Sequence, residues 1–224
     1  MSKLSKLPVI CALVVALGLT LSSCGKPAPD ITQQPGVQQT EQVPSFKENL
    51  HYRRVSNIAS HAAAKPFLVQ YFWFGCGHCQ QFEPVLHQIM AQNPQLQLVR
   101  KHAAVAPNWQ LDARIFFTLQ QMGHEAVTDP LFEIYIAQGQ PGPLELQQFL
   151  QQHNVDLEQF FELANNSEQV IARMLEANTE MEQNQIGGVP AIVVNGQYLI
   201  LHHQDTNNIE RYQALVRYLM QKAD

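Results

Sequence analysis

The pattern of apolar and polar positions in the first half of the folded region predicts an α/β arrangement. An almost uninterrupted apolar and aromatic run at residues 67–74 lies between a proline and a glycine, as expected of a central strand buried on both faces. Apolar residues then recur at helical spacing over 77–90, and Pro84 inside this pattern predicts a kinked helix. A short apolar run at 96–99 predicts a second strand, so strand, helix and strand follow one another.

The second half of the chain reads as helices followed by a hairpin. Between about residues 109 and 182, several helical patterns are separated by glycine, proline and asparagine breaks. Apolar segments at 191–194 and 197–201 flank Asn195-Gly196, which is a strong signal for a type I′ hairpin turn. Thr206 is expected to cap a final helix. The whole order fits an α/β sheet that is interrupted by a helical insertion.

The N-terminal segment, residues 1–23, reads as an export signal. Two lysines precede an apolar run at 7–21 that is too short to span a bilayer comfortably. The run ends in Leu-Ser-Ser-Cys24, which resembles the bacterial lipobox and makes Cys24 the expected site of lipid attachment. The alternative is a chance cysteine after an ordinary signal peptide, although no Ala-X-Ala cleavage site stands nearby. Gly25 after the lipid site resembles a sorting signal for the outer membrane.

Residues 24–45 are rich in proline, glutamine, glycine and threonine, so we expect them to form a flexible, lipid-anchored linker. The globular part is expected to begin near Phe46. The chain carries 14 basic and 19 acidic residues, and this formal charge of −5 lacks the basic excess that would attract phosphates. Nucleic acid is therefore not expected as a partner.

The cysteines indicate redox chemistry. Of the four, Cys11 lies in the export signal and Cys24 would carry lipid, which leaves Cys76 and Cys79. A single closely spaced pair in an exported domain of this size favours a reactive pair over a structural framework. Two alternatives remain open: an inert disulfide, and a structural zinc site completed by His202 and His203. Haem attachment is excluded, because Gln80 occupies the position of the required histidine, and no metal is expected.

The remaining histidines lack the spacing of metal ligands, so we expect them on the surface or partly buried: His51, His61, His87, His102, His124 and His153.

The position of Cys76 predicts its reactivity. It lies where a buried strand passes into a helix, so free N–H groups and the helix dipole should stabilise its thiolate. Cys79 follows one helical turn later on the same side and can close the disulfide. His78 can add a positive charge or a hydrogen bond near the sulfur. Because a stable thiolate favours the reduced pair, the oxidised pair should be a good oxidant.

Residues 71–86 and 187–198, together with the Asp-Pro-Leu-Phe-Glu segment at 129–133, resemble the bacterial DsbA family. The resemblance covers most of residues 46–222 and implies a thioredoxin-like fold formed by 46–105 and 185–224, with an inserted helical domain at 106–184. It also implies oxidation of reduced exported proteins without a cofactor. A membrane-bound, quinone-linked partner similar to DsbB would then reoxidise the pair.

The same resemblance assigns residues around the cysteine pair. Pro190 matches the family's cis-proline, and the backbone of Val189 would pair with a substrate segment. The sequence alone leaves a trans proline at a strand entry open. Glu83 and Lys101 match a buried acid and a buried lysine beneath the active site, while Gln70 replaces a second acid. A solvent-facing position for Glu83 also remains open.

Gly77 departs from the family, whose usual motif is Cys-Pro-His-Cys. The Cys-Gly-His-Cys found here resembles that of protein disulfide isomerases, so we expect less than maximal oxidising power. Two rival functions remain: a disulfide isomerase or reductase supplied by a reducing partner, and a tethered lipoprotein that binds extended peptides beside an inert disulfide.

Overall fold

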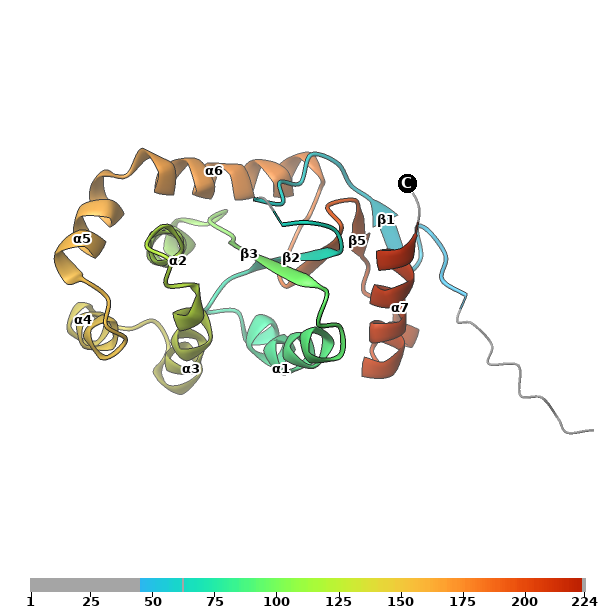
Figure 1. Ribbon diagram of the computed structural model, residues 1–224, viewed down its shortest axis with the longest axis horizontal. Helices are drawn as coiled ribbons and strands as arrows, with labels where there is room; N and C mark the ends of the chain where they lie inside the picture. Colours follow the sequence, from blue (N-terminus) through green and yellow to red (C-terminus); the bar gives the residue numbers. More distant parts are fainter. Residues whose placement is uncertain (1–44, 62, 223–224) are drawn as a thin grey trace, which may run out of the picture. The chain divides into compact units, whose positions relative to one another are not determined.

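A five-stranded mixed sheet forms the centre of the protein (Figure 1). In the spatial order β1-β5-β4-β2-β3, only β2 and β3 run parallel, and the other neighbouring pairs are antiparallel. The strands are β1 (Tyr52–Arg54), β2 (Phe67–Phe72), β3 (Gln97–His102), β4 (Ala191–Val194) and β5 (Tyr198–Ile200).

The computed structural model describes residues 45–61 and 63–222. The expected export signal, Cys24 and the linker up to residue 44 lie outside these residues, so the predictions about them stay predictions. Among the residues that the structure describes, no helix has both the length and the apolar character needed to span a bilayer.

The central strand β2 is buried at all six positions, as its continuous apolar pattern predicts. The neighbouring β3 extends to residue 102, three residues beyond the predicted end. Its apolar pattern breaks at Arg100 and Lys101, and the prediction stopped there because charged residues are rarely buried. Both side chains are nevertheless largely buried, because each has a carboxylate partner.

The predicted hairpin between β4 and β5 is confirmed. Asn195 and Gly196 both have positive φ angles, 54° and 70°, as a type I′ turn requires. At Gly196 a β-carbon would lie 3.1 Å from the carbonyl oxygen of Ile58, so glycine also allows close packing.

Helices α1 (Gly77–Gln92) and α7 (Ile209–Gln221) cover one face of the sheet. Leu86 and Ile89 of α1 belong to the same apolar cluster as Leu215 of α7. The N-cap of α7 is Asn208, whose side chain accepts from two backbone N–H groups, so the prediction of Thr206 as the cap is wrong. Thr206 lies instead in a short 3-10 turn, η2 (Gln204–Thr206).

The predicted helical block consists of five α-helices between β3 and β4, and α6 extends from it along the other face of the sheet (Figure 1). Met181 near the end of α6 packs with Tyr71 of β2 and Val193 of β4. The members are α2 (Pro107–Gln121), the 3-10 turn η1 (Glu125–Val127), α3 (Thr128–Gln138), α4 (Pro143–Gln152), α5 (Leu157–Asn166) and α6 (Glu168–Gln183).

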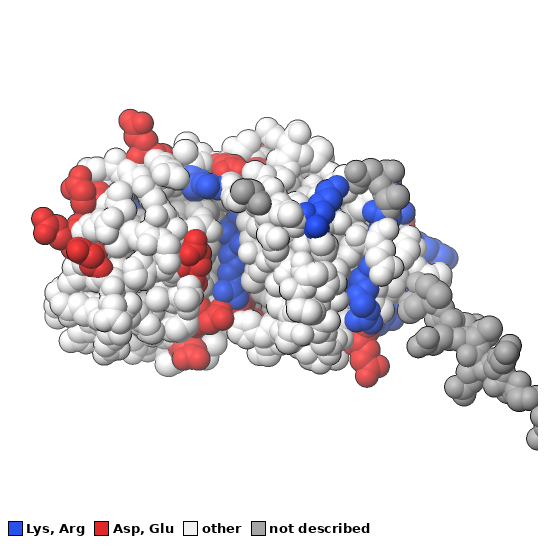
Figure 2. All heavy atoms as spheres, viewed as in Figure 1, with Lys and Arg blue, Asp and Glu red and all other residues white. Residues whose placement is uncertain are grey.

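The helical block and the rest of the chain differ in charge. Residues 106–184 contain 12 of the 19 acidic residues and 2 of the 14 basic residues. On the face seen in Figure 2, acidic side chains lie mostly over the helices, and basic side chains lie mostly over the half that contains the sheet. The modest net charge of the chain therefore conceals two regions of opposite charge.

Candidate active site

Cys76 is the N-cap of α1, as the sequence predicts. Its backbone is extended (φ −85°, ψ 111°), and its sulfur accepts a hydrogen bond from the backbone N–H of Cys79 at 3.4 Å. The side chain is half-buried. A sulfur in this position can be stabilised as an anion by the N–H groups of the first helical turn and can still meet another molecule.

Cys79 is buried completely, with no exposed surface. Burial raises the pKa of the Cys79 thiol, and the neighbouring Cys76 and the charge of Glu83 raise it further, against a hydrogen bond from the backbone of Trp73. The two cysteines are free thiols in this structure. Cys76 is therefore the sulfur that a partner molecule can reach, while Cys79 is protected and protonated at neutral pH.

The loop before β4 faces the reactive sulfur. The Val189–Pro190 peptide bond is cis, which agrees with the assignment of Pro190 and rules out the trans alternative. The thiol of Cys76 donates to the carbonyl oxygen of Val189 at 3.5 Å. This loop is thus placed to guide an extended segment past Cys76. A second cis bond, Lys65–Pro66, lies just before β2 and was not expected from the sequence.

His78 lies in the first turn of α1 with its side chain exposed. No hydrogen bond between His78 and either sulfur is found among the residues that the structure describes. Its predicted effect on the thiolate would therefore act through charge or through a different side-chain position, and it stays a prediction. Gly77 is the first helical residue, and a β-carbon there would meet no atom within 4 Å.

Glu83 is buried in a polar cluster on the α1 face of the sheet, so the solvent-facing alternative is wrong. Its two oxygens accept from the side chains of Gln70 and Arg100, each at 2.6 Å. Burial raises the pKa of Glu83, while the charge of Arg100 and the hydrogen bond from Gln70 oppose the rise. Arg100 also donates to Asp129 at 2.6 Å, and Asp129 pairs with His87 at 3.0 Å.

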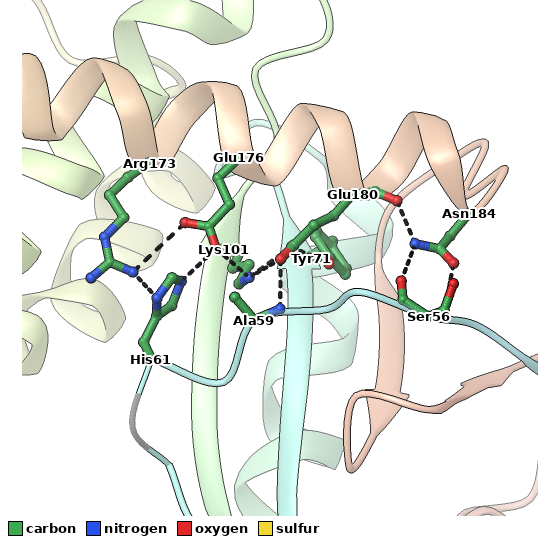
Figure 3. A network of polar contacts seen from close by, with 9 residues as sticks. All are labelled: Ser56, Ala59, His61, Tyr71, Lys101, Arg173, Glu176, Glu180 and Asn184. Atoms are coloured by element: carbon green, nitrogen blue, oxygen red, sulfur yellow. Dashed lines mark hydrogen bonds and ion pairs between the residues drawn. The ribbon is translucent and has the colours of Figure 1, made fainter.

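Lys101 is buried as predicted, but the prediction that it lies with Glu83 beneath the active site is wrong. Its ammonium donates to both oxygens of Glu180 at 2.7 Å, under α6 on the opposite face of the sheet (Figure 3). The hydroxyl of Tyr71 donates to the same carboxylate at 2.6 Å. Successive side chains of a strand point to opposite faces, so Arg100 and not Lys101 meets Glu83.

A buried acid, Asp112, holds the residues just before Cys76, and no pattern in the sequence pointed to it. Asp112 accepts from the indole N–H of Trp73 at 2.7 Å, and Tyr135 and Gln140 donate to its other oxygen. Trp73 in turn occupies the space beside Gly75, where a β-carbon would lie 2.5 Å from the indole ring. Asp112 of α2 therefore connects the segment just before Cys76 to the helical block.

The family description DSBA-like thioredoxin domain matches residues 68–214. The chain belongs to this family. It is 34% identical over 135 residues to the thiol:disulfide interchange protein DsbA of Azotobacter vinelandii, over 58% of this chain and 63% of that protein. The corresponding protein of Burkholderia cepacia is 26% identical over 165 residues, covering 72% and 77%.

The structural comparison agrees with the family assignment. The crystal structure of Pseudomonas aeruginosa DsbA has a TM-score of 0.66 at 28% identity, and the match covers 79% of this chain and 93% of that one. The predicted resemblance to the DsbA family and the thioredoxin-like fold with a helical insertion are thus confirmed. The sequence match spans less than two thirds of the Azotobacter protein, at 63% of its length.

Among the described residues, two clusters each bring three side chains that could ligate a metal within 4.8 Å of one another. They are His51, His203 and Asp205, and Glu83, His87 and Asp129. In the first, Nδ1 of His51 accepts from the backbone N–H of Lys47, so Nε2 carries the proton and donates to Asp205. In the second, the guanidinium of Arg100 lies between the two carboxylates. Each cluster thus already has a proton or a cation where a metal would bind.

His102 departs from the expectation of an exposed or partly buried side chain. It is fully buried among aromatic rings, and burial lowers its pKa to about 3, so the ring is neutral. Nδ1 donates to the carbonyl of Ala103 at 2.8 Å, and Nε2 accepts from the backbone N–H of Phe74 at 3.4 Å. The ring thereby supports the strand end that leads to Cys76. His51 is also buried.

Proposed function

We propose that this protein is a thiol:disulfide interchange protein that introduces disulfide bonds into exported proteins through Cys76 and Cys79. One observation carries the proposal: a half-buried sulfur at a helix N-terminus faces the Val189–Pro190 loop, while its partner sulfur is sealed inside the protein. This arrangement offers one sulfur to a substrate and reserves the other for the internal step.

The reaction starts from the oxidised pair. A substrate thiolate attacks the sulfur of Cys76, the bond to Cys79 breaks, and Cys79 leaves as a thiolate that takes up a proton. Burial raises the pKa of the Cys79 thiol, which makes that protonation favourable. Because only a thiolate attacks a disulfide, protonated Cys79 does not reverse the step. A second substrate thiolate then attacks the mixed disulfide and releases Cys76. The substrate loses two electrons and two protons, and the cysteine pair gains both.

The substrate would bind along the cis-proline loop. The backbone of Val189 is positioned to pair with an extended segment, and such pairing recognises main chain and not a particular sequence. An apolar groove of about 170 Å³ continues beyond Pro190 and is lined by Phe82, Val85, Ile192 and Tyr212, among others. The substrate segment next to the substrate's own cysteine would place its side chains in this groove.

The cellular setting rests on the sequence. The export signal, the lipid site at Cys24 and the linker would hold the domain in the periplasm on a membrane, with the outer membrane indicated by Gly25. A quinone-linked membrane protein of the DsbB type would accept electrons from the reduced pair. If Cys24 carries lipid, a Cys24→Ala protein will leave the membrane fraction while wild-type protein remains there. Equal membrane association of both would refute the anchor.

The central experiment compares the oxidised wild-type protein with two variants that each keep one of the two cysteines. Cys76→Ser should abolish oxidation of a reduced dicysteine peptide. When Cys79→Ser is mixed with a disulfide-bonded peptide, the Cys76 thiolate should attack that disulfide, release one peptide thiol and accumulate as a mixed disulfide, visible by mass spectrometry. A Cys76→Ser protein that oxidises the peptide at the wild-type rate would falsify the proposal. A reduced wild-type protein whose Cys76 resists alkylation at neutral pH would instead favour the binding lipoprotein with an inert disulfide.

A disulfide isomerase or reductase is the second candidate, because Gly77 gives the chain an isomerase-like motif. Equilibration with glutathione buffers fixes the reduction potential and thus the direction of electron flow. Gly77→Pro is a suitable companion variant, since proline fits the first helical position and nothing crowds the site. We expect the variant to be the stronger oxidant. A wild-type pair found mostly reduced in cells would support the isomerase or reductase.

A further inference from the structure

We infer that a hollow at the C-terminal end of α6 is a specificity pocket for the substrate. It would hold the apolar side chain of the second residue after the substrate's own cysteine. The inference rests on the proposed function. The hollow measures about 470 Å³, and its wall includes Val105, Trp109, Met181, Ile186 and the Gly187-Gly188 pair. The hollow is lined by Gly187 and Gly188, which precede Val189 in the chain. The groove described above is lined by Pro190 and Ile192, which follow Val189.

The pocket adjoins the reactive sulfur through two chain segments. On one side, Gly188 immediately precedes Val189, whose carbonyl oxygen lies 3.5 Å from the Cys76 sulfur. On the other side, Trp109 stacks on Trp73 with 4.5 Å between ring centroids. Trp73 stands three residues before Cys76. A peptide attached to Cys76 therefore reaches the pocket within a few residues.

The chemistry of the wall selects an apolar occupant. Met181 and Ile186 are 3% and 6% exposed and form an apolar floor, and Val105 is 55% exposed at the edge. Asn178 and Glu182 also line the pocket. The side-chain oxygen of Asn178 accepts from the backbone N–H of Ala104 at 2.9 Å, which fixes this part of the rim. The exposed Glu182, the one acidic residue of this lining, disfavours a substrate carboxylate.

Strand geometry places one substrate residue at the pocket. If the substrate pairs antiparallel with the loop, residues after its cysteine lie opposite Gly188 and then Gly187. Side chains of an extended segment alternate, so the second residue after the cysteine points to the same side as the cysteine itself. Neither glycine would bring a β-carbon within 4 Å of another atom, so this side of the loop is open.

The experiment uses the full oxidised protein and single-cysteine peptides that differ at the second residue after the cysteine: Leu, Gly or Asp. Two peptide thiols reduce the Cys76–Cys79 disulfide and form a peptide dimer, and the second-order rate constant is measured. We expect the Leu peptide to react about tenfold faster than the Gly peptide, the scale of discrimination that a single apolar pocket provides. The Asp peptide should be slowest.

Two variants test whether the pocket causes the preference. Gly188→Leu fills it, and Val105→Lys places a charge at its edge; each should bring the ratio of Leu to Gly rates close to one. Leu144→Lys is the matched control, because Leu144 is also exposed, at 74%, and does not line the pocket. If Gly188→Leu does not fold, Val105→Lys decides.

The outcomes separate the two proposals. Equal rates for the Leu and Gly peptides with wild-type protein, or an unchanged ratio in the folded pocket variants, would overturn the pocket and leave the proposed function intact. If none of the peptides reduces the oxidised protein, the proposed function itself fails. A ratio that falls equally in Leu144→Lys would show that the effect is not specific to the pocket and would also overturn it.

Discussion

The two faces of the sheet each carry a buried ion pair, and the two basic residues are neighbours on β3. Lys101 meets Glu180 under α6, where the two side chains are 1% and 5% exposed. Arg100 meets Glu83 under α1, but its other nitrogen continues to Asp129, which is 46% exposed. We call the first pair closed, because among the described residues the only further carboxylate near the ammonium of Lys101 is Glu176, at 3.7 Å and 31% exposed. We call the second pair open, because Arg100 contacts Asp129 directly at 2.6 Å and so connects the interior to the surface.

This difference indicates different roles. The closed pair is surrounded by partners that fix the fold, since Tyr71 and the backbone N–H of Ala59 also donate to Glu180 (Figure 3). The open pair contains Glu83, whose charge raises the pKa of Cys79. We therefore expect substitutions in the closed pair to act on stability, and substitutions in the open pair to act also on the cysteines.

The largest effect is expected for Lys101→Met, which leaves the buried charge of Glu180 without its cation. Breaking a buried ion pair by removing one partner costs about 3–5 kcal/mol of unfolding free energy. Denaturant unfolding measures it. The double variant Lys101→Met, Glu180→Leu is the control, because it removes the unpaired charge and should recover part of the loss. A loss below that of the matching Arg100 variant would contradict the comparison.

Arg100→Met is expected to lower the unfolding free energy by a smaller amount, about 1–3 kcal/mol. Glu83 keeps the hydrogen bond from Gln70 in this variant and can take up a proton. The variant should also change the rate at which Cys79 resolves a mixed disulfide, measured by quenched-flow with a peptide bound at Cys76. Lys101→Met supplies the matched control, since it should leave that rate near the wild-type value per folded molecule. Equal effects of both variants on this rate would remove the distinction between the faces.

The pH dependence of stability should single out Glu83. Its folded pKa is raised above the ordinary 4.5, so its contribution is full below that value and is lost as pH rises through the raised pKa. The unfolding free energy of wild type minus that of Glu83→Gln should therefore fall as the pH rises from 4.5 through the raised pKa of Glu83, and then level off. A difference that increases with pH would show that Arg100 outweighs the burial of the carboxylate.

The smallest effect is expected at the surface end of the open pair. Asp129→Asn removes the charge that pairs with Arg100 and with His87, which is 51% exposed. Exposed pairs contribute about 0.2–1 kcal/mol, and this contribution should shrink further in high salt. Thermal unfolding at low and high salt measures it. A loss as large as that of Arg100→Met would mean that the chain of contacts acts as one unit.

Much of the fold could be predicted from local patterns. The continuous apolar run of β2, the helix after it and the Asn195-Gly196 hairpin each depend on the residues themselves, and all three are confirmed. The short edge strand β1 was missed, because its three residues contain two arginines and show no apolar alternation. It is stabilised by pairing with β5, which is distant in sequence.

The site was predictable where chemistry depends on neighbours in sequence, as for Cys76 and Cys79. It was not predictable where contacts join distant segments. Choosing between Arg100 and Lys101 as the partner of Glu83 requires the phase of β3 relative to α1, which the charged residues hide. Strand alternation alone could have suggested that the two point to opposite faces. Nothing in the sequence distinguished Asp112 from an ordinary surface acid.

Gly75 and Gly77 stand on either side of the reactive cysteine with opposite tolerance for mutation. The ring of Trp73 fills the space beside Gly75, so any other residue there must displace the indole from Asp112 and from Trp109. Beside Gly77 there is open space. In a library randomised at both positions and selected for activity, position 75 should return glycine. Position 77 should return many different residues, and these should change the reduction potential of the Cys76–Cys79 pair.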